Sequence, residues 1–498
     1  MSPDKSDTSG KGSKDRKSGG AADAPSAPDQ AKVAAAIEAF KEWAAKDPGA
    51  ATAAIEAFKE IAQRAPGATY SGPKRAICLA GGGPAVGLHI GALEGLKEKG
   101  GIDFGNERSI WALSCIGAWV GIVYNQATKG SELEETYNFF HDVFRDDKSF
   151  QSFPINTIFA PDWAGCAEAA WNFLLEPEHY RNAFLPRHIM QSYLHTLSYL
   201  RDRKNWGKFS EGDFNRWTLN HVMAVHPAVR FLTALLYKSE IDGRSRLHYK
   251  DSKFLKDIKF EKLNERGRPY IFHNAFNFAK QDIDLFANDS PGWGRKGHKA
   301  ISAASLCACS ALPYIEQTVR VDGDVYCEGA LVDTVNFATL LQDHHSKSDP
   351  LEEIWINRIV DTRQIRKPEN MHDALANLCE MFAATVGEDD VKLFKFHVEE
   401  NNRLPEDKRK GPEWTGTIVE IEVDDQIDFH WSHKNLDRGR INGARNAANA
   451  YKLYEKYKDF KKPYVTMIPD DLTDEQILAA GVPLSPKRLR EAKLRQAK

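Results

Sequence analysis

Residues 75–121 read RAICLAGGGPAVGLHIGALEGLKEKGGIDFGNERSIWALSCIGAWVG. An apolar run at 76–80, typical of a buried strand, ends in three glycines and is followed by apolar residues at helical spacing. A second apolar run, 110–113, leads through a tight turn at 114–118 into another apolar segment. This order predicts the start of an α/β fold with a doubly wound, mostly parallel sheet. Both loops then lie at the carboxyl ends of strands, where such sheets place their sites.

The glycine loop 81–83 is suited to binding a negative charge, because backbone N–H groups that precede a helix converge on one point. The charge is either a phosphate or the oxyanion of an acyl-transfer intermediate. A phosphate loop needs Gly-Lys-Ser/Thr after its glycines, whereas Leu88 and His89 follow Gly87 here. The spacing also misses the dinucleotide-binding fingerprint Gly-x-Gly-x-x-Gly. The sequence therefore favours the oxyanion.

The two loops resemble those of the patatin-like phospholipase family. They carry Gly-Gly-Gly-x-x-x-Gly-x-His-x-Gly-x-Leu at 81–93 and Gly-Ala-x-Val-Gly at 117–121. A third family element has a counterpart in VYCEGALVD at 325–333, preceded by the small-residue run AASLCACSALP at 303–313. Three motifs in the family's order make the resemblance specific. It implies a lipid acyl hydrolase that uses a nucleophile–carboxylate dyad and needs no metal or other cofactor.

The resemblance places Cys115 at the position of the family's nucleophilic serine and Glu328 at the position of its catalytic aspartate. Ser114 is the nucleophile only in a shifted register, which puts Ile116 where a small residue is needed. The resemblance further implies that Asn274 lies near the substrate cleft. The implied oxyanion hole consists of Gly81, Gly82 and Gly83, and the implied supporting residues are Ser114, Gly117, Gly329 and Ala330.

A Cys/Glu pair admits two interpretations. A thiol ionises with a pKa of about 8.5, far below that of a hydroxyl, and a helix N-terminus lowers this pKa further. A neighbouring carboxylate opposes the ionisation through like-charge repulsion. The pair is therefore either a rebuilt dyad or a relic in which Cys115 is a small buried apolar residue. The first interpretation predicts a hydrolase, and the second predicts an inactive protein that binds lipid or storage granules.

The composition excludes some partners. The chain has 498 residues and a net charge of −3, without a basic patch interleaved with aromatic residues, so we expect no nucleic acid partner. The first thirty residues lack the apolar region of a signal peptide, and no apolar run reaches eighteen residues. We expect a cytoplasmic protein whose lipid partner permits peripheral attachment to a membrane or granule surface.

The cysteines predict no metal site. Seven cysteines at irregular spacing are typical of reduced thiols, and no C-x-x-C pair indicates zinc. Cys307 and Cys309 are too close in sequence for the usual structural zinc pair, so we interpret them as small packing residues.

The N-terminal region contains a repeat. Residues 1–30 are rich in Ser, Lys, Gly and Pro and are predicted to be a disordered tail. The segment AAIEAFKE occurs at 35–42 and again at 53–60, each copy followed by Pro-Gly. Each copy predicts a short amphipathic helix within 31–70. The repeat is a helical hairpin that packs on the catalytic domain or a partner, an anchor to a lipid or polymer surface, or a linker.

The remaining chain predicts a catalytic domain at 74–360 and a C-terminal extension of helices and strands at 361–498. The catalytic domain contains an aromatic-rich helical insertion at about 150–250, interpreted as a cap whose aromatics pack a core or line an acyl channel. We expect strands at 268–278, 354–360 and 417–423, and helices at 132–144, 371–385 and 443–457. A basic helix is expected after 486.

Overall fold

The computed structural model describes residues 72–144, 162–202, 210–219, 226–246, 252–290, 293–337, 339–361, 365, 367–424, 427, 430–460 and 465–496. The predicted tail at 1–30 and the predicted helical repeat at 31–70 lie outside these residues. Among the described residues, no helix has the length and apolar character required to cross a bilayer.

The main sheet has the strand order β12-β11-β10-β1-β2-β4-β5-β6, and β4 also pairs with β9, which pairs with β8. Neighbouring strands from β12 to β4 are parallel, whereas β4 pairs antiparallel with both β5 and β9. The parallel strands are β1 (Arg75–Leu79), β2 (Ser109–Leu113), β4 (Tyr270–Asn277), β10 (Glu353–Asn357), β11 (Thr417–Glu420) and β12 (Thr466–Ile468). The other strands are β5 (Asp282–Ala287), β6 (Lys299–Ala300), β8 (Val319–Val321) and β9 (Asp324–Glu328).

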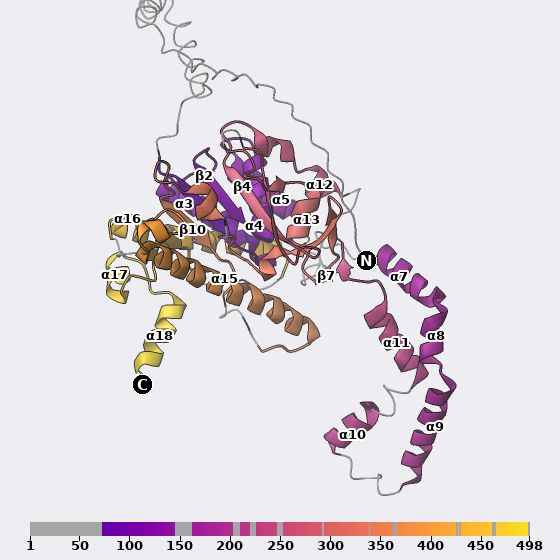
Figure 1. Ribbon diagram of the computed structural model, residues 1–498. Coiled ribbons are helices and arrows are strands. Elements are labelled where there is room, and N and C mark those ends of the chain that lie inside the picture. Colours follow the sequence, from indigo (N-terminus) through magenta and orange to yellow (C-terminus); the bar gives the residue numbers. More distant parts are fainter. Residues whose placement is uncertain are drawn as a thin grey trace, which may run out of the picture. The chain divides into compact units, whose positions relative to one another are not determined.

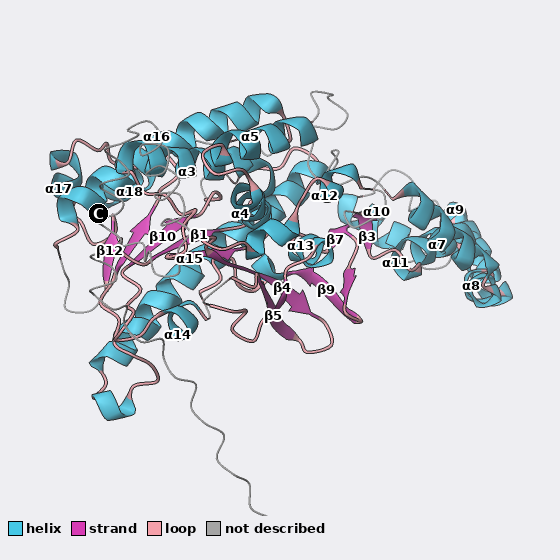
Figure 2. Ribbon diagram, turned by 90° about the horizontal axis from the view of Figure 1, so that it is seen from above, coloured by secondary structure: helices cyan, strands magenta, loops and turns pink. Residues whose placement is uncertain are grey.

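Helices cover both faces of this sheet, which confirms the predicted doubly wound α/β fold. Leu79 and Leu113 face one core together with α3 (Gly87–Gly100), α4 (Ile116–Gln126), α5 (Glu132–Val143) and α16 (His433–Tyr457). Cys78 and Ala112 face the opposite core, together with α14 (Leu340–His344) and α15 (Met371–Arg403). Figure 2 shows α3, α5 and α16 on one side of the strands and α14 on the other. Burial on both faces explains why β1 and β2 are nearly continuous apolar runs.

Most expected elements are present, but several boundaries differ. The helix expected at 371–385 continues to Arg403, and the helix expected at 443–457 begins at His433. The predicted C-terminal extension contributes β11 and β12 to the main sheet, followed by α17 (Asp474–Ala479) and α18 (Pro486–Gln496). Strand β7 (Tyr314–Glu316) pairs with β3 (Gly243–Ser245) in a separate two-stranded sheet.

The described part of the predicted insertion is helical, as expected (Figure 1). It comprises α7 (Trp163–Leu175), α8 (Pro177–Ala183), α9 (Pro186–Arg201), α10 (Glu211–Trp217) and α11 (Pro227–Lys238). The interpretation that these aromatics pack a core is right for Phe173, which is 3% exposed and stacks on His179. The same interpretation is wrong for Trp163 and Trp171, which are 76% and 61% exposed. Both tryptophans lie on α7, where Leu174 and Leu175 are also exposed.

Helices α3 and α16 pack backbone to backbone along a seam of glycines, which we call the glycine seam: Gly87, Gly91 and Gly95 on α3 with Gly439 and Gly443 on α16. A Cβ atom at Gly91 would overlap the carbonyl of Arg440, and one at Gly443 would overlap the carbonyl of Leu88. A bidentate ion pair joins the same helices, with Arg440 Nε and Nη2 2.7 and 2.8 Å from the Glu94 carboxylate. Only residues without side chains permit this close approach.

We predict that Gly91→Ala destabilises the protein. The added Cβ would lie 1.9 Å from the Arg440 carbonyl oxygen, a backbone atom, so the displacement of α16 should cost about 3 kcal/mol, the upper end of the usual range. This cost exceeds the helix-propensity gain of about 1 kcal/mol from replacing Gly with Ala. Urea unfolding measures the effect. Gly411→Ala is the matched control, because no atom lies within 4 Å of its added Cβ. A Gly91→Ala protein as stable as the control would show that α16 does not pack closely against α3.

Candidate active site

Cys115 lies at the turn between β2 and α4, in a backbone conformation that side chains rarely adopt. Its φ and ψ are 47° and −123°, so a non-glycine residue has a positive φ, which costs conformational strain. The turn is tight: a Cβ at Gly117 would overlap the carbonyl of Leu79. A strained strand-to-helix turn that presents a nucleophile is the geometry of a nucleophile elbow.

Three loops meet at Gly81. A Cβ atom built there would lie 3.2 Å from Cys115 Cβ, 3.4 Å from Ala330 Cβ and 3.7 Å from Glu328 Oε1. The Cys115 thiol donates a hydrogen bond to the Glu328 carboxylate. The structure thus brings together the residues that the sequence placed at the nucleophile, carboxylate and oxyanion positions. The absence of a side chain at Gly81 leaves room between them.

Glu328 is the last residue of β9, and the sheet fixes its position. It pairs with Ala275 of β4, and its N–H donates to the Ala311 carbonyl at 2.9 Å. The next residue must be small, because a Cβ at Gly329 would lie 2.7 Å from Asn274 Oδ1. The Glu328 side chain is buried, with 6% of the residue exposed.

Burial controls the ionisation of this pair. It raises the pKa of Glu328 from its ordinary value to about 7, which the hydrogen bond from Cys115 partly offsets. Burial, and then the neighbouring Glu328 carboxylate, raise the pKa of the Cys115 thiol well above its ordinary value. Near pH 7 the thiol therefore carries its proton, while a substantial fraction of Glu328 is ionised and accepts the hydrogen bond. This arrangement is suited to proton transfer from sulfur to carboxylate during attack on a substrate.

The glycine loop turns sharply between β1 and the 3₁₀ helix η1 (Gly83–Val86). Gly82 and Gly83 have φ values of 157° and 49°, which favour glycine. A Cβ at Gly82 would also lie within 2.8 Å of the side chains of Ile359 and Val360. The loop leads into α3, so its N–H groups lie at the positive end of a helix dipole.

A buried histidine anchors the residue before this loop. His89 Nε2 lies 2.9 Å from the Ala80 carbonyl, and Asn357 Nδ2 donates to His89 Nδ1 at 2.9 Å. The proton on His89 is therefore on Nε2, which donates to Ala80. Burial lowers the pKa of His89 to about 4, so the ring stays neutral at physiological pH. The sequence showed His89 only as a motif position, and its partner Asn357 at the end of β10 carried no recognisable signal.

Ser114 supports the site without facing it. Its side chain is fully buried, and its hydroxyl lies 3.3 Å from Asn274 Oδ1 and 3.4 Å from the Asp333 carbonyl. Asn274 Nδ2 donates to the same carbonyl at 2.7 Å. The two side chains thereby tie the elbow to the loop that follows Glu328. This arrangement favours Cys115 over Ser114 as the nucleophile.

Cys309 is the neighbour that the sequence analysis did not assign to the site. It is the last residue of α13 (Ala303–Cys309), and its sulfur accepts a hydrogen bond from the Cys115 N–H at 3.1 Å. We expected Cys307 and Cys309 to be packing residues, and both are fully buried. The available signal was the position of Cys309 in the small-residue run before the third motif.

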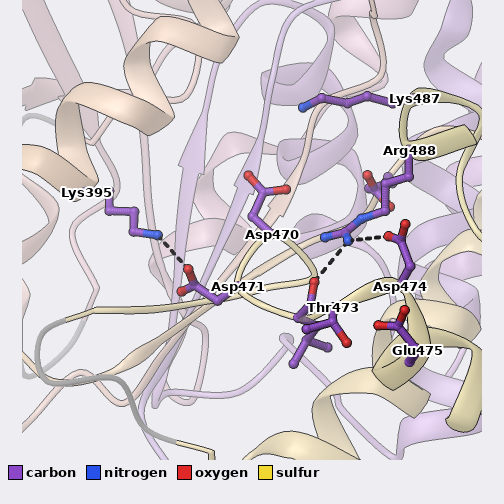
Figure 3. A pocket seen from close by; sticks show the side chains of 10 residues that line it. Lys395, Asp470, Asp471, Thr473, Asp474, Glu475, Lys487 and Arg488 are labelled. Carbon is purple, nitrogen blue, oxygen red and sulfur yellow. Dashed lines mark hydrogen bonds and ion pairs between the residues drawn. The ribbon is translucent and has the colours of Figure 1, made fainter. Parts of the chain in front are cut away.

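A separate polar cavity of about 570 Å³ lies where β12 ends and α17 and α18 begin (Figure 3). Two ion pairs lie among its lining residues: Lys395 with Asp471 at 3.1 Å, and Arg488 with Asp474 at 3.1 Å. Neither Cys115 nor Glu328 lines it. Across the described residues, no three His, Cys, Asp or Glu side chains are grouped so that they could hold a metal ion.

Residues 77–341, more than half of the chain, match the family model described as Patatin-like phospholipase. The matched region begins in β1 and ends in α14, so it contains the glycine loop, Cys115 and Glu328. A search of curated proteins returned no match. Asn357 and the glycine-seam helix α16 lie beyond the matched region.

We predict that Glu328→Gln accelerates the alkylation of Cys115 by iodoacetamide at pH 8. The substitution removes a negative charge that raises the pKa of the thiol, so more of the reactive thiolate is present. Peptide mapping of the labelled protein measures the rate. Cys166, whose pKa is raised by burial and by Asp162, serves as an internal reference in the same digest. An unchanged rate at Cys115 would contradict the proximity of the two groups.

Proposed function

Because the chain belongs to the patatin-like phospholipase family, we propose that this hydrolase cleaves a lipid acyl ester through a covalent acyl-enzyme. Cys115 is the nucleophile and Glu328 is the general base. The observation that carries the proposal is the meeting of the strained Cys115, the buried Glu328 and the glycine loop around Gly81. The proposed substrate is a lipid, reached in solution or by peripheral attachment to a membrane or granule surface.

The first half of the reaction forms a thioester. Ionised Glu328 takes the thiol proton while the sulfur attacks the ester carbonyl carbon, and the carbonyl electrons move to its oxygen. The N–H groups of Gly82 and Gly83 stabilise this oxyanion, each by about 3–4 kcal/mol. When the tetrahedral intermediate collapses, the carbon–oxygen bond breaks, and protonated Glu328 returns its proton to the leaving alcohol.

The second half releases the acyl group. Glu328, again ionised, takes a proton from water as the water oxygen attacks the thioester carbonyl. The same glycine N–H groups stabilise the second oxyanion. The carbon–sulfur bond then breaks, Glu328 returns its proton to the sulfur, and a carboxylic acid leaves. One carboxylate thus serves as base and acid in both halves, without a histidine.

A non-catalytic lipid- or granule-binding protein is the second candidate. The observation that favours it is the raised pKa of the Cys115 thiol, because the protonated thiol is a weak nucleophile. The two candidates share the fold and a lipid ligand, and they differ only in turnover.

Hydrolysis of a chromogenic short-chain ester tests the proposal. We expect turnover by the wild type and a loss of about 10³-fold or more in Cys115→Ala, because the nucleophile is removed. Cys166→Ala is the matched control, since Cys166 is a partly exposed thiol on α7, and it should retain activity. Equal rates for wild type and Cys115→Ala would favour the binding protein.

The pH dependence of turnover follows from the ionisation of Glu328. We predict that kcat/KM rises with pH through about 7, because Glu328 must be ionised to accept the thiol proton. Below this pH the carboxyl group is protonated and the rate falls tenfold per pH unit. Initial rates between pH 5 and pH 8 measure the profile. A profile that is flat across this range would remove Glu328 from the role of base.

We predict that Glu328→Gln stabilises the fold at pH 8 while it abolishes turnover. The folded-state pKa of Glu328 lies above its ordinary value, so the unfolded chain loses this proton first and stability falls as pH rises from about 4.5 to about 7. The neutral amide avoids this loss of about 3 kcal/mol. Urea unfolding at pH 8 and pH 4 measures the difference, which should vanish at pH 4. An equal effect at both pH values would indicate altered packing instead of charge.

A further inference from the structure

Cys309 is a direct neighbour of Cys115, because its sulfur contacts the Cys115 backbone. The sulfur of Cys309 lies 3.1 Å from the backbone nitrogen of Cys115. A backbone nitrogen is about 1.46 Å from its own Cα atom, so this sulfur lies within about 4.6 Å of Cys115 Cα. A disulfide between the two then requires the Cys115 side chain to rotate about its Cα–Cβ bond until its sulfur faces Cys309. Both cysteines are free thiols.

The surroundings of Cys309 act on its sulfur in opposite directions. Burial, and then the Glu328 carboxylate, raise the pKa of the Cys309 thiol above its ordinary value, and hydrogen bonds from the backbone N–H groups of Cys115 and Asn274 partly offset this rise. Glu328 lies within electrostatic range of both sulfurs. Cys309 is fully buried, whereas Cys115 is partly exposed, so an oxidant reaches Cys115 first.

We propose that Cys115 is a site of reversible oxidation by hydrogen peroxide, and that Cys309 resolves it as an intramolecular disulfide. The sulfur of Cys115 attacks one peroxide oxygen, the O–O bond breaks, and the thiol proton passes through Glu328 to the leaving hydroxide as water. The product is the sulfenic acid of Cys115. The sulfur of Cys309 then attacks the sulfur of Cys115, the S–O bond breaks, and hydroxide leaves with the Cys309 proton as a second water. Two thiols and one peroxide give one disulfide and two waters.

Two other cysteines lie close enough to be compared. Cys379 on α15 is half-buried and lies within electrostatic range of Glu328. Cys307 is fully buried and lies within electrostatic range of Glu316 and Cys309. For neither does a contact with Cys115 match the 3.1 Å approach of Cys309. The disulfide does not depend on the proposed acyl chemistry, so its failure and the failure of the proposed function are distinguishable.

The experiment treats the reduced full-length chain with hydrogen peroxide, blocks remaining thiols and digests the protein with trypsin. We expect a cross-link between the peptides 109–129 and 300–320, with fragment ions that place it at Cys309. Because burial raises the pKa of Cys115, the cross-link should form faster at pH 9 than at pH 7. Dithiothreitol should restore both free thiols, together with any esterase activity that the wild type shows.

Variants separate the resolving cysteine from its neighbours. Cys307→Ser is the matched control on the same helix and should keep the cross-link. Cys309→Ser should lose it and accumulate the sulfinic and sulfonic acids of Cys115, which dithiothreitol does not reverse. If Cys309→Ser does not fold, the fragment ions of the wild type alone decide whether the cross-link is at Cys309. Over-oxidised Cys115 without a cross-link in the wild type, or a cross-link to Cys307 or Cys379, would overturn the proposal.

Discussion

The contact on which the site depends is the glycine seam between α3 and α16. It holds α3 against a helix that lies more than 300 residues later in the chain, and α3 begins directly after the glycine loop. η1 and α3 follow the glycine loop directly, so a movement of α3 would displace that loop. The seam therefore ties the candidate site to a helix of the C-terminal segment, although the family match ends at residue 341. The Asn357–His89–Ala80 hydrogen bonds connect the end of β10 to the residue before the same loop.

The sequence predicted what depends on local pattern. The apolar runs of β1 and β2, the glycine loop and the elbow motif were all visible, because each follows from strand burial or from a turn that requires glycine. The sequence did not predict where Cys309 and Asn357 lie, since each contacts the site across the tertiary fold and neither has a characteristic spacing. The full length of α15 was also missed: the helix continues through Gly387 and the acidic residues 388–390, where apolar periodicity is interrupted.

The exposed helices of the insertion mark another limit of pattern-based prediction. The aromatic residues of the insertion, Trp163 and Trp171 among them, were interpreted as packing a core or lining an acyl channel. Their exposure shows that helical periodicity identifies an apolar face but not the layer that covers it. Phe173, on the same helix, is buried because His179 stacks on it and Phe231 meets its ring edge to face, both from neighbouring helices. Trp171 and Phe173 are only two residues apart on α7, yet the first is exposed and the second is buried.

Burial raises the pKa of both Cys115 and Glu328, and the two effects are coupled. It brings the pKa of Glu328 close to 7, where a carboxylate is a stronger base than in water. The same burial keeps Cys115 protonated, so the sulfur gains its nucleophilicity only as Glu328 removes the proton. If burial did not raise the pKa of the Cys115 thiol, its thiolate would react with any electrophile that reached the pocket. In the proposed reactions with an ester and with a peroxide, the proton of Cys115 therefore passes to the same carboxylate, that of Glu328.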